Sequence, residues 1–233
     1  MSLLFAKLCE FVYFANSSNK SLPAHSMFIT FEGLDYSGKS TQVKLLADAL
    51  KHAHHNILVL REPGGTEIGE KIRAILLDKN ITGMTNVSEL FLFSASRSQL
   101  VEEVIKPALE GNLVVLCDRF YDSLTAYQGW GKGVSLEAVQ VINQCATGGL
   151  VPDLSFFLDL PIEEVERRMH RSHAARDRME SNGRSFYERV REGYLNLAKS
   201  EKRFHIINGM ESIETIQETV WNAVLELLEH RKK

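Results

Sequence analysis

Residues 33–40, Gly-Leu-Asp-Tyr-Ser-Gly-Lys-Ser, constrain the fold more than any other segment of the chain. They match the pattern GxxxxGK[ST] and lie between a short apolar run and a stretch with helical spacing. Glycine adopts backbone angles that a Cβ atom penalises, so successive N–H groups at a helix N-terminus can converge on phosphate oxygens. The segment therefore predicts a phosphate-binding loop, or P-loop, between a strand and a helix.

From Met27 onward, short apolar runs alternate with longer stretches at helical spacing, which is typical of a parallel sheet wrapped by helices. A long helical pattern covers residues 87–110, where Pro107 is expected to kink or end the helix. Phe93 and Arg97, four residues apart, should share one face of that helix. We expect an α/β, P-loop NTPase fold, with a five-stranded parallel sheet, helices on both faces and an Arg-rich lid. The expected strands are 28–33, 57–62, 113–117, 154–159 and 204–207.

The overall charge gives no hint of a polynucleotide partner, because 27 Lys and Arg residues face 30 Asp and Glu residues, a formal charge of -3. An anion site must therefore be local. No apolar run reaches the roughly 18 residues that a membrane span needs, so we expect no membrane partner. The three cysteines are far apart and lack CxxC spacing, which argues against a disulfide framework or a zinc site and fits a reducing cytoplasm.

Residues 1–26 look unlike the rest of the chain. Their longest apolar run, Phe11 to Ala15, is too short for the core of a signal peptide. Two interpretations stay open: an added segment that packs on the domain or hangs free, or a start codon placed too early, with Met27 as the true first residue. No repeat or linker follows, so residues 27–233 are predicted to form a single domain.

The P-loop motif assigns roles to individual residues. Lys39 is expected to reach the β and γ phosphates of a nucleotide, and the Ser40 hydroxyl to bind Mg²⁺, a hard ion that keeps several waters. At the end of the run 113–117, Asp118 is placed to hold the water shell of that ion and Arg119 to bind a phosphate, unless the two form only a surface ion pair. The predicted nucleotide-binding set is Gly33, Leu34, Asp35, Tyr36, Ser37, Gly38, Lys39, Ser40 and Thr41.

A cationic segment interrupts this mildly acidic chain between residues 167 and 191. Arginine keeps its charge and offers a planar fork, so the segment is suited to close over a transferring phosphoryl group as a lid. About half of these side chains are expected only to solubilise helix surfaces. A nucleic-acid-binding helix is the other alternative, which the lack of interleaved aromatic residues disfavours. The arginines are Arg167, Arg168, Arg171, Arg176, Arg178, Arg184, Arg189 and Arg191.

Five ordered motifs carry a resemblance to a known family. They are FEGLDYSGKSTQ, REPGGTEIGEKIRAILL, ELFLFSASR, CDRFYDSLTAYQG and the lid with Asp177-Arg178-Met179-Glu180. From Met27 to near the C-terminus the chain resembles the thymidylate kinases. The resemblance implies transfer of a phosphoryl group from ATP, with Mg²⁺, to dTMP, giving dTDP for dTTP synthesis. It also implies a cytoplasmic homodimer that contacts neither nucleic acid nor membrane.

The resemblance further implies roles for the residues around the acceptor nucleotide. Phe93 would stack on the thymine ring, Arg97 would hydrogen-bond the base, and Tyr127 would crowd the place of a 2′-hydroxyl. Tyr36 stands where some relatives carry an arginine, so Arg178 of the lid is the predicted catalytic arginine. The predicted acceptor-binding set is Asp35, Glu62, Arg73, Phe93, Arg97, Arg119, Ser123, Tyr127 and Gln128, and the predicted catalytic set is Lys39, Asp35, Arg119 and Arg178.

Three other functions are alternatives for a chain with this P-loop. A deoxynucleoside kinase phosphorylates a neutral hydroxyl and needs a carboxylate base, for which Glu62 is placed. Arg73 and Arg119 would then be an odd surplus of positive charge. Other nucleoside monophosphate kinases are a second alternative. A GTP-dependent switch is the weakest, because NKxD and DxxG motifs do not occur after Ser40.

Overall fold

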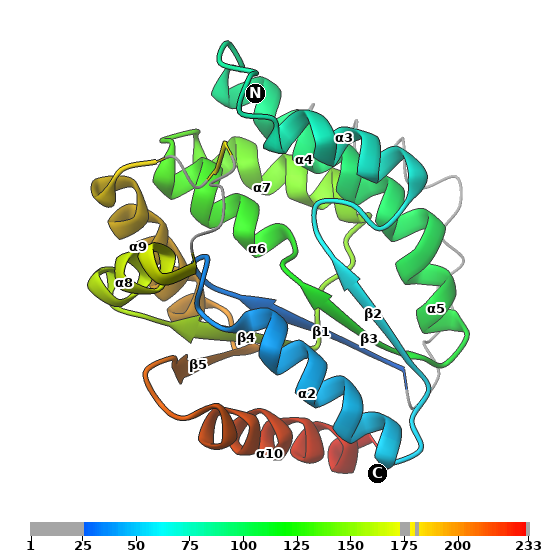
Figure 1. Cartoon of the computed structure of the whole chain (residues 1–233). Helices are drawn as coiled ribbons and strands as arrows, with labels where there is room; N and C mark the ends of the chain where they lie inside the picture. The colour runs from blue at the N-terminus through cyan, green and yellow to red at the C-terminus, as the bar shows by residue number, and fades with distance from the viewer. Residues whose placement is uncertain (1–25, 173–177, 180–181, 232–233) are drawn as a thin grey trace.

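The computed structural model describes residues 26–172, 178–179 and 182–231. Its centre is a parallel sheet of five strands in the order β2-β3-β1-β4-β5 (Figure 1). The strands are β1 (Met27–Glu32), β2 (Ile57–Arg61), β3 (Val114–Asp118), β4 (Leu154–Asp159) and β5 (Phe204–Asn208). The five predicted strands are confirmed to within one residue at either end.

Helices cover both faces of the sheet (Figure 1). On one face lie α2 (Lys39–His52) and α10 (Ile213–Arg231), which pack on alternate strand residues such as Ile29 and Phe31. Phe28 points to the opposite face, as the two-residue period of a strand requires. That face carries α3 (Glu67–Leu77), α4 (Asn86–Leu100), η1 (Val101–Ile105), α5 (Lys106–Glu110), α6 (Tyr121–Leu124), η2 (Thr125–Gly131), α7 (Leu136–Thr147), α8 (Ile162–Ser172) and α9 (Arg184–Ser200).

The long helix predicted over residues 87–110 is present, but it is not uniform. Between α4 and α5 the turns of η1 are π-helical, and they end two residues before Pro107. Proline has no N–H and its ring clashes with the carbonyl four residues earlier, so a wider turn at this point lets the chain stay helical. Pro107 therefore does not end the helix.

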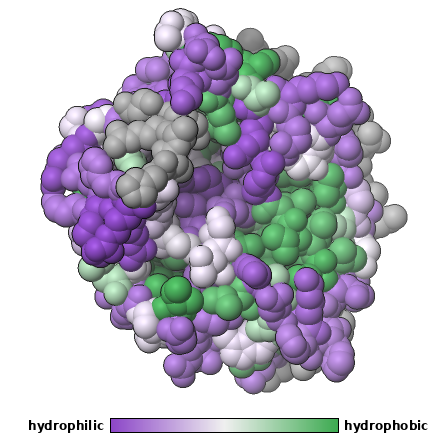
Figure 2. Space-filling model, in the orientation of Figure 1, coloured by the Kyte–Doolittle hydropathy of each residue, from purple (hydrophilic) through white to green (hydrophobic). Residues whose placement is uncertain are grey.

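Two cysteines and one apolar surface patch are further features of the fold. Cys117 in β3 is free and fully buried, as expected of a core residue, while Cys145 is disulfide-bonded, which the cysteine spacing did not predict. Figure 2 shows an apolar patch over the edge strand β2, where Leu58 and Leu60 are partly buried and Val59 is exposed. Among the described residues, no helix is long and apolar enough to cross a membrane.

The parallel arrangement places the loops after β1, β2 and β3 at one edge of the sheet. The P-loop follows β1, and residues 118–119 end the neighbouring strand β3. Ligands of open α/β sheets bind at this carboxyl edge. The fold therefore gathers the predicted site residues in one place.

Candidate functional site

The P-loop has the backbone geometry that its glycines predict. Gly33 and Gly38 have φ angles of 138° and 97°, and Tyr36 between them also lies in the left-handed region at 63°. A Cβ atom on Gly33 would lie 2.7 Å from the carbonyl oxygen of Leu158, so this position requires glycine. Successive N–H groups in such a loop form a concavity suited to an anion.

Lys39 begins α2, and its ammonium group turns back into the loop. Its Nζ donates to the carbonyl oxygens of Leu34 at 2.7 Å and Gly33 at 3.3 Å. Burial, followed by repulsion from Arg119, lowers the pKa of Lys39 to about 8. A bound phosphate would oppose both effects, because a nearby anion favours the charged ammonium.

Ser40, in the first turn of α2, lies beside Asp118, the last residue of β3. Ser40 Oγ donates a 2.5 Å hydrogen bond to Asp118 Oδ2. A hydroxyl and a carboxylate are the hard oxygen ligands that Mg²⁺ prefers. In the described part of the chain, no group of three or more His, Cys, Asp or Glu side chains could hold a metal ion. The pair therefore fits an ion that keeps most of its waters and takes its other ligands from a nucleotide.

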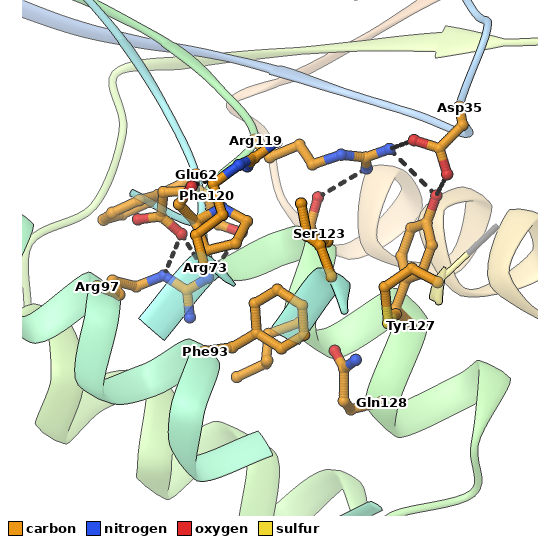
Figure 3. A pocket seen from close by; sticks show the side chains of 14 residues that line it. Asp35, Glu62, Arg73, Phe93, Arg97, Arg119, Phe120, Ser123, Tyr127 and Gln128 are labelled. Atoms are coloured by element: carbon orange, nitrogen blue, oxygen red, sulfur yellow. Dashed lines mark hydrogen bonds and ion pairs between the residues drawn. The ribbon is translucent and has the colours of Figure 1, made fainter. Parts of the chain in front are cut away.

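Arg119 joins the P-loop to the end of β3. Its left-handed backbone, φ 73°, follows the strand directly and turns the side chain toward the loop. Nη1 donates to Gly33 O at 2.8 Å and to Ser123 Oγ at 3.1 Å, and Nη2 to Asp35 Oδ1 at 2.6 Å and the Tyr127 hydroxyl at 3.2 Å (Figure 3). Burial would raise the pKa of Asp35, but the charges of Arg119 and Lys39 outweigh it and hold that pKa below its ordinary value.

Behind Arg119 lies a carboxyl group that the sequence analysis did not assign. Glu32, at the end of β1, is fully buried and accepts hydrogen bonds from Phe120 N at 2.8 Å, Ser123 Oγ at 2.6 Å and the Tyr194 hydroxyl at 3.1 Å. Burial, with a contribution from Asp122, raises the pKa of Glu32 to about 8. Glu32 therefore holds a proton more readily than an ordinary carboxyl group, and its hydrogen bond with Ser123 positions that side chain.

The acceptor cavity is the pocket drawn in Figure 3. All nine residues predicted to bind the acceptor nucleotide line it, so segments from seven different elements or loops converge there. Phe93 and Arg97 lie on one face of α4, as their spacing predicts (Figure 3). The other lining residues are Pro63, Leu77, Phe120, Leu124 and Met179.

A buried ion pair forms one wall of this cavity. Glu62 Oε2 accepts hydrogen bonds from Arg97 Nε at 2.8 Å and Nη2 at 2.6 Å, and both side chains are almost completely buried. Among the described residues, Glu62 Oε1 and Arg97 Nη1 have no hydrogen-bond partner. Burial raises the pKa of Glu62, and the charge of Arg97 opposes that shift. Buried polar atoms are normally satisfied, so these two are candidates for ligand contacts.

A second cavity opens along the P-loop. Tyr36, Gly38, Lys39, Ser40 and Thr41 line it, together with Asp118. It shares four lining residues with the acceptor cavity, and we call these four the shared wall. They are Asp35, Glu62, Arg73 and Arg119. Two cavities that meet at two arginines and two carboxylates are suited to bring the phosphates of two nucleotides together.

Two arginines of the predicted lid segment, Arg168 and Arg178, make different contacts in the structure. Arg168 of α8 lines the P-loop cavity and donates to the carbonyl oxygens of Tyr36 at 3.2 Å and Gly209 at 3.1 Å. Arg178, predicted to be catalytic, lies instead beside α3 and α4, where Nε donates to Leu76 O at 2.7 Å and Nη1 pairs with Glu89 Oε2 at 2.5 Å. Of these two arginines, Arg168 is the one that lines the P-loop cavity. The lid residues 173–177 and 180–181, with Arg176, Asp177 and Glu180, lie outside the described residues.

Sequence reasoning also missed Glu89. It precedes Phe93 by four residues on α4 and accepts a hydrogen bond from Gln128 Nε2 at 2.9 Å. The motif ELFLFSASR contained the signal, because Glu89, Phe93 and Arg97 repeat every four residues and must share a helix face. For Arg168 there was no comparable signal, since eight arginines share its segment.

Comparisons with known proteins point to one family. A family model described as thymidylate kinase matches residues 31–220. The thymidylate kinase of Thermoanaerobacter sp. (strain X514) is 46% identical over 202 residues, which are 86% of this chain and 98% of that protein. That of Thermosipho africanus (strain TCF52B) is 48% identical over 190 residues, 82% of this chain and 93% of the relative. The crystal structure of thymidylate kinase from Ehrlichia chaffeensis superposes with a TM-score of 0.70 at 35% identity, covering 86% of this chain and 98% of the other.

Proposed function

Because the chain belongs to the thymidylate kinase family, and therefore transfers a phosphoryl group from ATP to dTMP to give dTDP, we propose that its two connected cavities hold these two nucleotides. The P-loop cavity holds the phosphates of ATP, and the acceptor cavity holds dTMP. The observation that carries this assignment is the shared wall, which borders both cavities at the carboxyl edge of the sheet. The γ phosphate of ATP and the phosphate of dTMP then meet beside Arg73 and Arg119.

The base of dTMP lies against α4 in this proposal. Phe93 stacks on the thymine ring, and the unpartnered Arg97 Nη1 donates to a carbonyl oxygen of the base. Gln128 lines the same cavity and contacts the Watson–Crick edge. Tyr127 is nearly buried and fixed by its contacts with Arg119, so it excludes a 2′-hydroxyl and selects a deoxyribose.

The phosphates of both nucleotides are held by charge. Arg73 and Arg119 neutralise the acceptor phosphate, and Lys39 neutralises the β and γ phosphates of ATP. Asp35 holds the Arg119 guanidinium in place. Ser40 and Asp118 would hold Mg²⁺ directly or through its waters, and the ion would supply additional neutralisation of charge on the transferring group.

Phosphoryl transfer to dTMP needs little acid–base catalysis. The second pKa of a phosphate monoester is about 6, so the acceptor oxygen is mostly ionised at neutral pH. The bond from that oxygen to the γ phosphorus forms in line as the bond to the β–γ bridging oxygen breaks, and ADP leaves. Positioning and charge neutralisation by Lys39, Arg119 and a lid arginine carry the rate. We assign the lid role to Arg168 rather than Arg178 on the geometry above.

The deoxynucleoside kinase alternative is not favoured. The carboxylate base that this alternative needs, Glu62, is ion-paired with Arg97 through Oε2, and only its Oε1 is left to accept a proton. Arg73 and Arg119 have a clear partner in the phosphate of dTMP and none in thymidine. The relatives at 45–48% identity are thymidylate kinases.

We further propose that two copies of the chain form a homodimer through α3 and α4. These helices pack on each other and expose four large apolar side chains, Ile68 and Ile75 on α3 and Val87 and Phe91 on α4. Exposed apolar clusters of this kind mark protein interfaces. We also propose a cytoplasmic location, where dTDP is consumed on the way to DNA synthesis.

A coupled assay of ADP release tests the function. With Mg-ATP, fast turnover with dTMP and little with thymidine is expected, and a preference for thymidine would overturn the assignment. The same assay on a shortened chain that starts at Met27 tests our proposal that residues 27–233 form the catalytic domain. Equal rates are expected from the full and shortened chains.

A further inference from the structure

Glu89 is a buried carboxylate whose role neither the motif pattern nor the reaction explains. Its Oε1 accepts hydrogen bonds from Gln128 Nε2 at 2.9 Å and Lys132 Nζ at 2.6 Å, and its Oε2 lies 2.5 Å from Arg178 Nη1. Only 1% of its surface is exposed. Two hydrogen-bond donors and one further cation, the Arg178 guanidinium, therefore surround one carboxylate beside the acceptor cavity.

Glu89 is held in its charged form by these donors. Burial alone would raise the pKa of Glu89, but the hydrogen bonds of Lys132 and Gln128 and the charges of Lys132 and Arg178 outweigh it and keep that pKa below its ordinary value. A carboxylate accepts hydrogen bonds and has none to donate. The side-chain amide of Gln128 must therefore turn its nitrogen, not its oxygen, toward Glu89.

The opposite end of that amide faces the cavity. In Figure 3 the Gln128 oxygen lies on the side of the Phe93 ring, and the nitrogen points away from it. Gln128 lines the acceptor cavity, and its Oε1 accepts no hydrogen bond from the described residues. Arg97 lines the same cavity, and its Nη1 has no hydrogen-bond partner among the described residues. The cavity thus offers one acceptor and one donor to the edge of a base.

This pair of groups distinguishes the pyrimidines. Thymine and uracil present a carbonyl acceptor, O4, next to a donor, N3–H, whereas cytosine presents an amino donor, N4, next to an acceptor, N3. Gln128 could satisfy cytosine N3 only by turning its nitrogen toward the base. That turn would bring Oε1 against the Glu89 carboxylate, where two acceptors would face each other without a proton between them.

We propose that Glu89 is a specificity-determining positioning residue. By holding the Gln128 amide with its oxygen toward the base, it makes the acceptor cavity select monophosphates whose base carries an N3–H donor over those of cytosine. This inference rests on the placement of the base proposed above. Gln128 contacts the base, and Glu89 acts through Gln128.

The test compares ligands within one protein, so that a general loss of stability cancels. The affinities of dTMP, dUMP and dCMP are measured by calorimetry for the unaltered chain and for Glu89→Gln, in which residue 89 can donate or accept and Gln128 can turn. The dTMP to dCMP affinity ratio is expected to fall about tenfold or more, the range for one unsatisfied buried hydrogen bond. The dTMP to dUMP ratio should stay unchanged, because both bases carry N3–H.

Lys132→Ala is the matched control. It removes another donor of Glu89 but leaves the hydrogen bond between Gln128 and Glu89 in place, so its dTMP to dCMP ratio should stay near that of the unaltered chain. An unchanged ratio in Glu89→Gln would overturn the inference, and so would an equal loss of the ratio in Lys132→Ala.

A chemical variant of the ligand repeats the test without any substitution in the protein. dTMP methylated at N3 has no donor there, and the unaltered chain should bind it at least about tenfold more weakly than dTMP. Equal binding of the methylated ligand would also overturn the inference. If the unaltered chain did not prefer dTMP to dCMP at all, the proposed placement of the base would fail instead.

Discussion

Arg119 Nη2 and Asp35 Oδ1 lie 2.6 Å apart and form an ion pair that links the residue after β3 to the P-loop. The same guanidinium also donates to Gly33, Ser123 and Tyr127, so one side chain organises the border between the two cavities. Its contacts use both terminal nitrogens, a geometry that a lysine ammonium cannot reproduce.

Replacing Arg119 should therefore damage catalysis even when charge is kept. We expect Arg119→Lys to lower kcat/KM for dTMP about 10²-fold and Arg119→Ala about 10³-fold, as for loss of a donor to a developing negative charge. Steady-state kinetics measure the effect, with thermal unfolding to check the fold. Arg171→Ala, at an exposed position of α8, is the control and should retain activity.

The affinity for ATP should depend on pH through Lys39. Because its pKa in the free protein is about 8, the ammonium loses its proton as pH rises above that value. ATP is already fully ionised there, so the loss of charge at Lys39 should raise the Kd of a non-hydrolysable ATP analogue between pH 8 and pH 9. Calorimetry at several pH values measures this change. The Kd of dTMP, whose cavity Lys39 does not line, should change less over the same interval.

Glu32 should make the fold less stable as pH rises. The folded-state pKa of Glu32 is about 8, against an ordinary value of 4.5, so between these two pH values the unfolded chain has lost a proton that the folded chain keeps. The contribution of Glu32 to the free energy of unfolding therefore falls as pH rises through this window. Glu32→Gln, which resembles the protonated acid, should flatten the dependence. Denaturant titrations from pH 5 to pH 8 measure it, and identical slopes in both proteins would contradict the prediction.

The two lid arginines should affect different kinetic constants. Arg168 lines the P-loop cavity, so Arg168→Ala should lower kcat at least about 10²-fold with a small change in the KM of dTMP. Arg178 is held by Glu89 and Leu76 beside the base, so Arg178→Ala should mainly raise the KM of dTMP. If Arg178→Ala lowered kcat and Arg168→Ala mainly raised the KM of dTMP, the catalytic role would belong to Arg178.

Introducing a charged side chain on the outer face of α4 should make the proposed dimer dissociate into monomers. Phe91 is 56% exposed and lies one turn from Val87, which is also exposed. Phe91→Glu would place a carboxylate in the centre of the apolar contact, at a cost of several kcal/mol per buried charge. Sedimentation velocity should show a dimer for the unaltered chain and a monomer for the variant. Glu103→Gln, an exposed change elsewhere on the same long helix, should leave the dimer intact.

Much of the candidate site could be predicted because its residues lie in motifs with fixed spacing and in loops that follow neighbouring parallel strands. The P-loop needs its glycines at fixed spacing, and Gly33 has no room for a Cβ atom. The residues after β3 had to reach the same edge because parallel strands end together. The nine residues predicted to bind the acceptor nucleotide come from ordered motifs, and all nine line one cavity.

What the sequence left open depends on contacts between distant segments. The left-handed backbone of Arg119 carries no local signal, since its residue type rarely adopts it. Choosing among eight lid arginines requires knowing that Arg168 reaches Tyr36 while Arg178 reaches Glu89, positions 132 and 89 residues away. The raised pKa of Glu32 likewise depends on burial among residues that follow β3 and residues of α9, which no linear pattern encodes.

The shared wall limits which substitutions could make such an enzyme resistant to an inhibitor. Both cavities are bordered by the same four side chains, Asp35, Glu62, Arg73 and Arg119. A substitution at any of them that weakens the binding of an inhibitor in one cavity should therefore also disturb the ligand in the other cavity. An inhibitor built to rest on these four side chains would therefore leave few escape mutations that spare turnover. A compound that contacts only the Phe93 end of the acceptor cavity would select for substitutions there, and those would leave the P-loop cavity undisturbed.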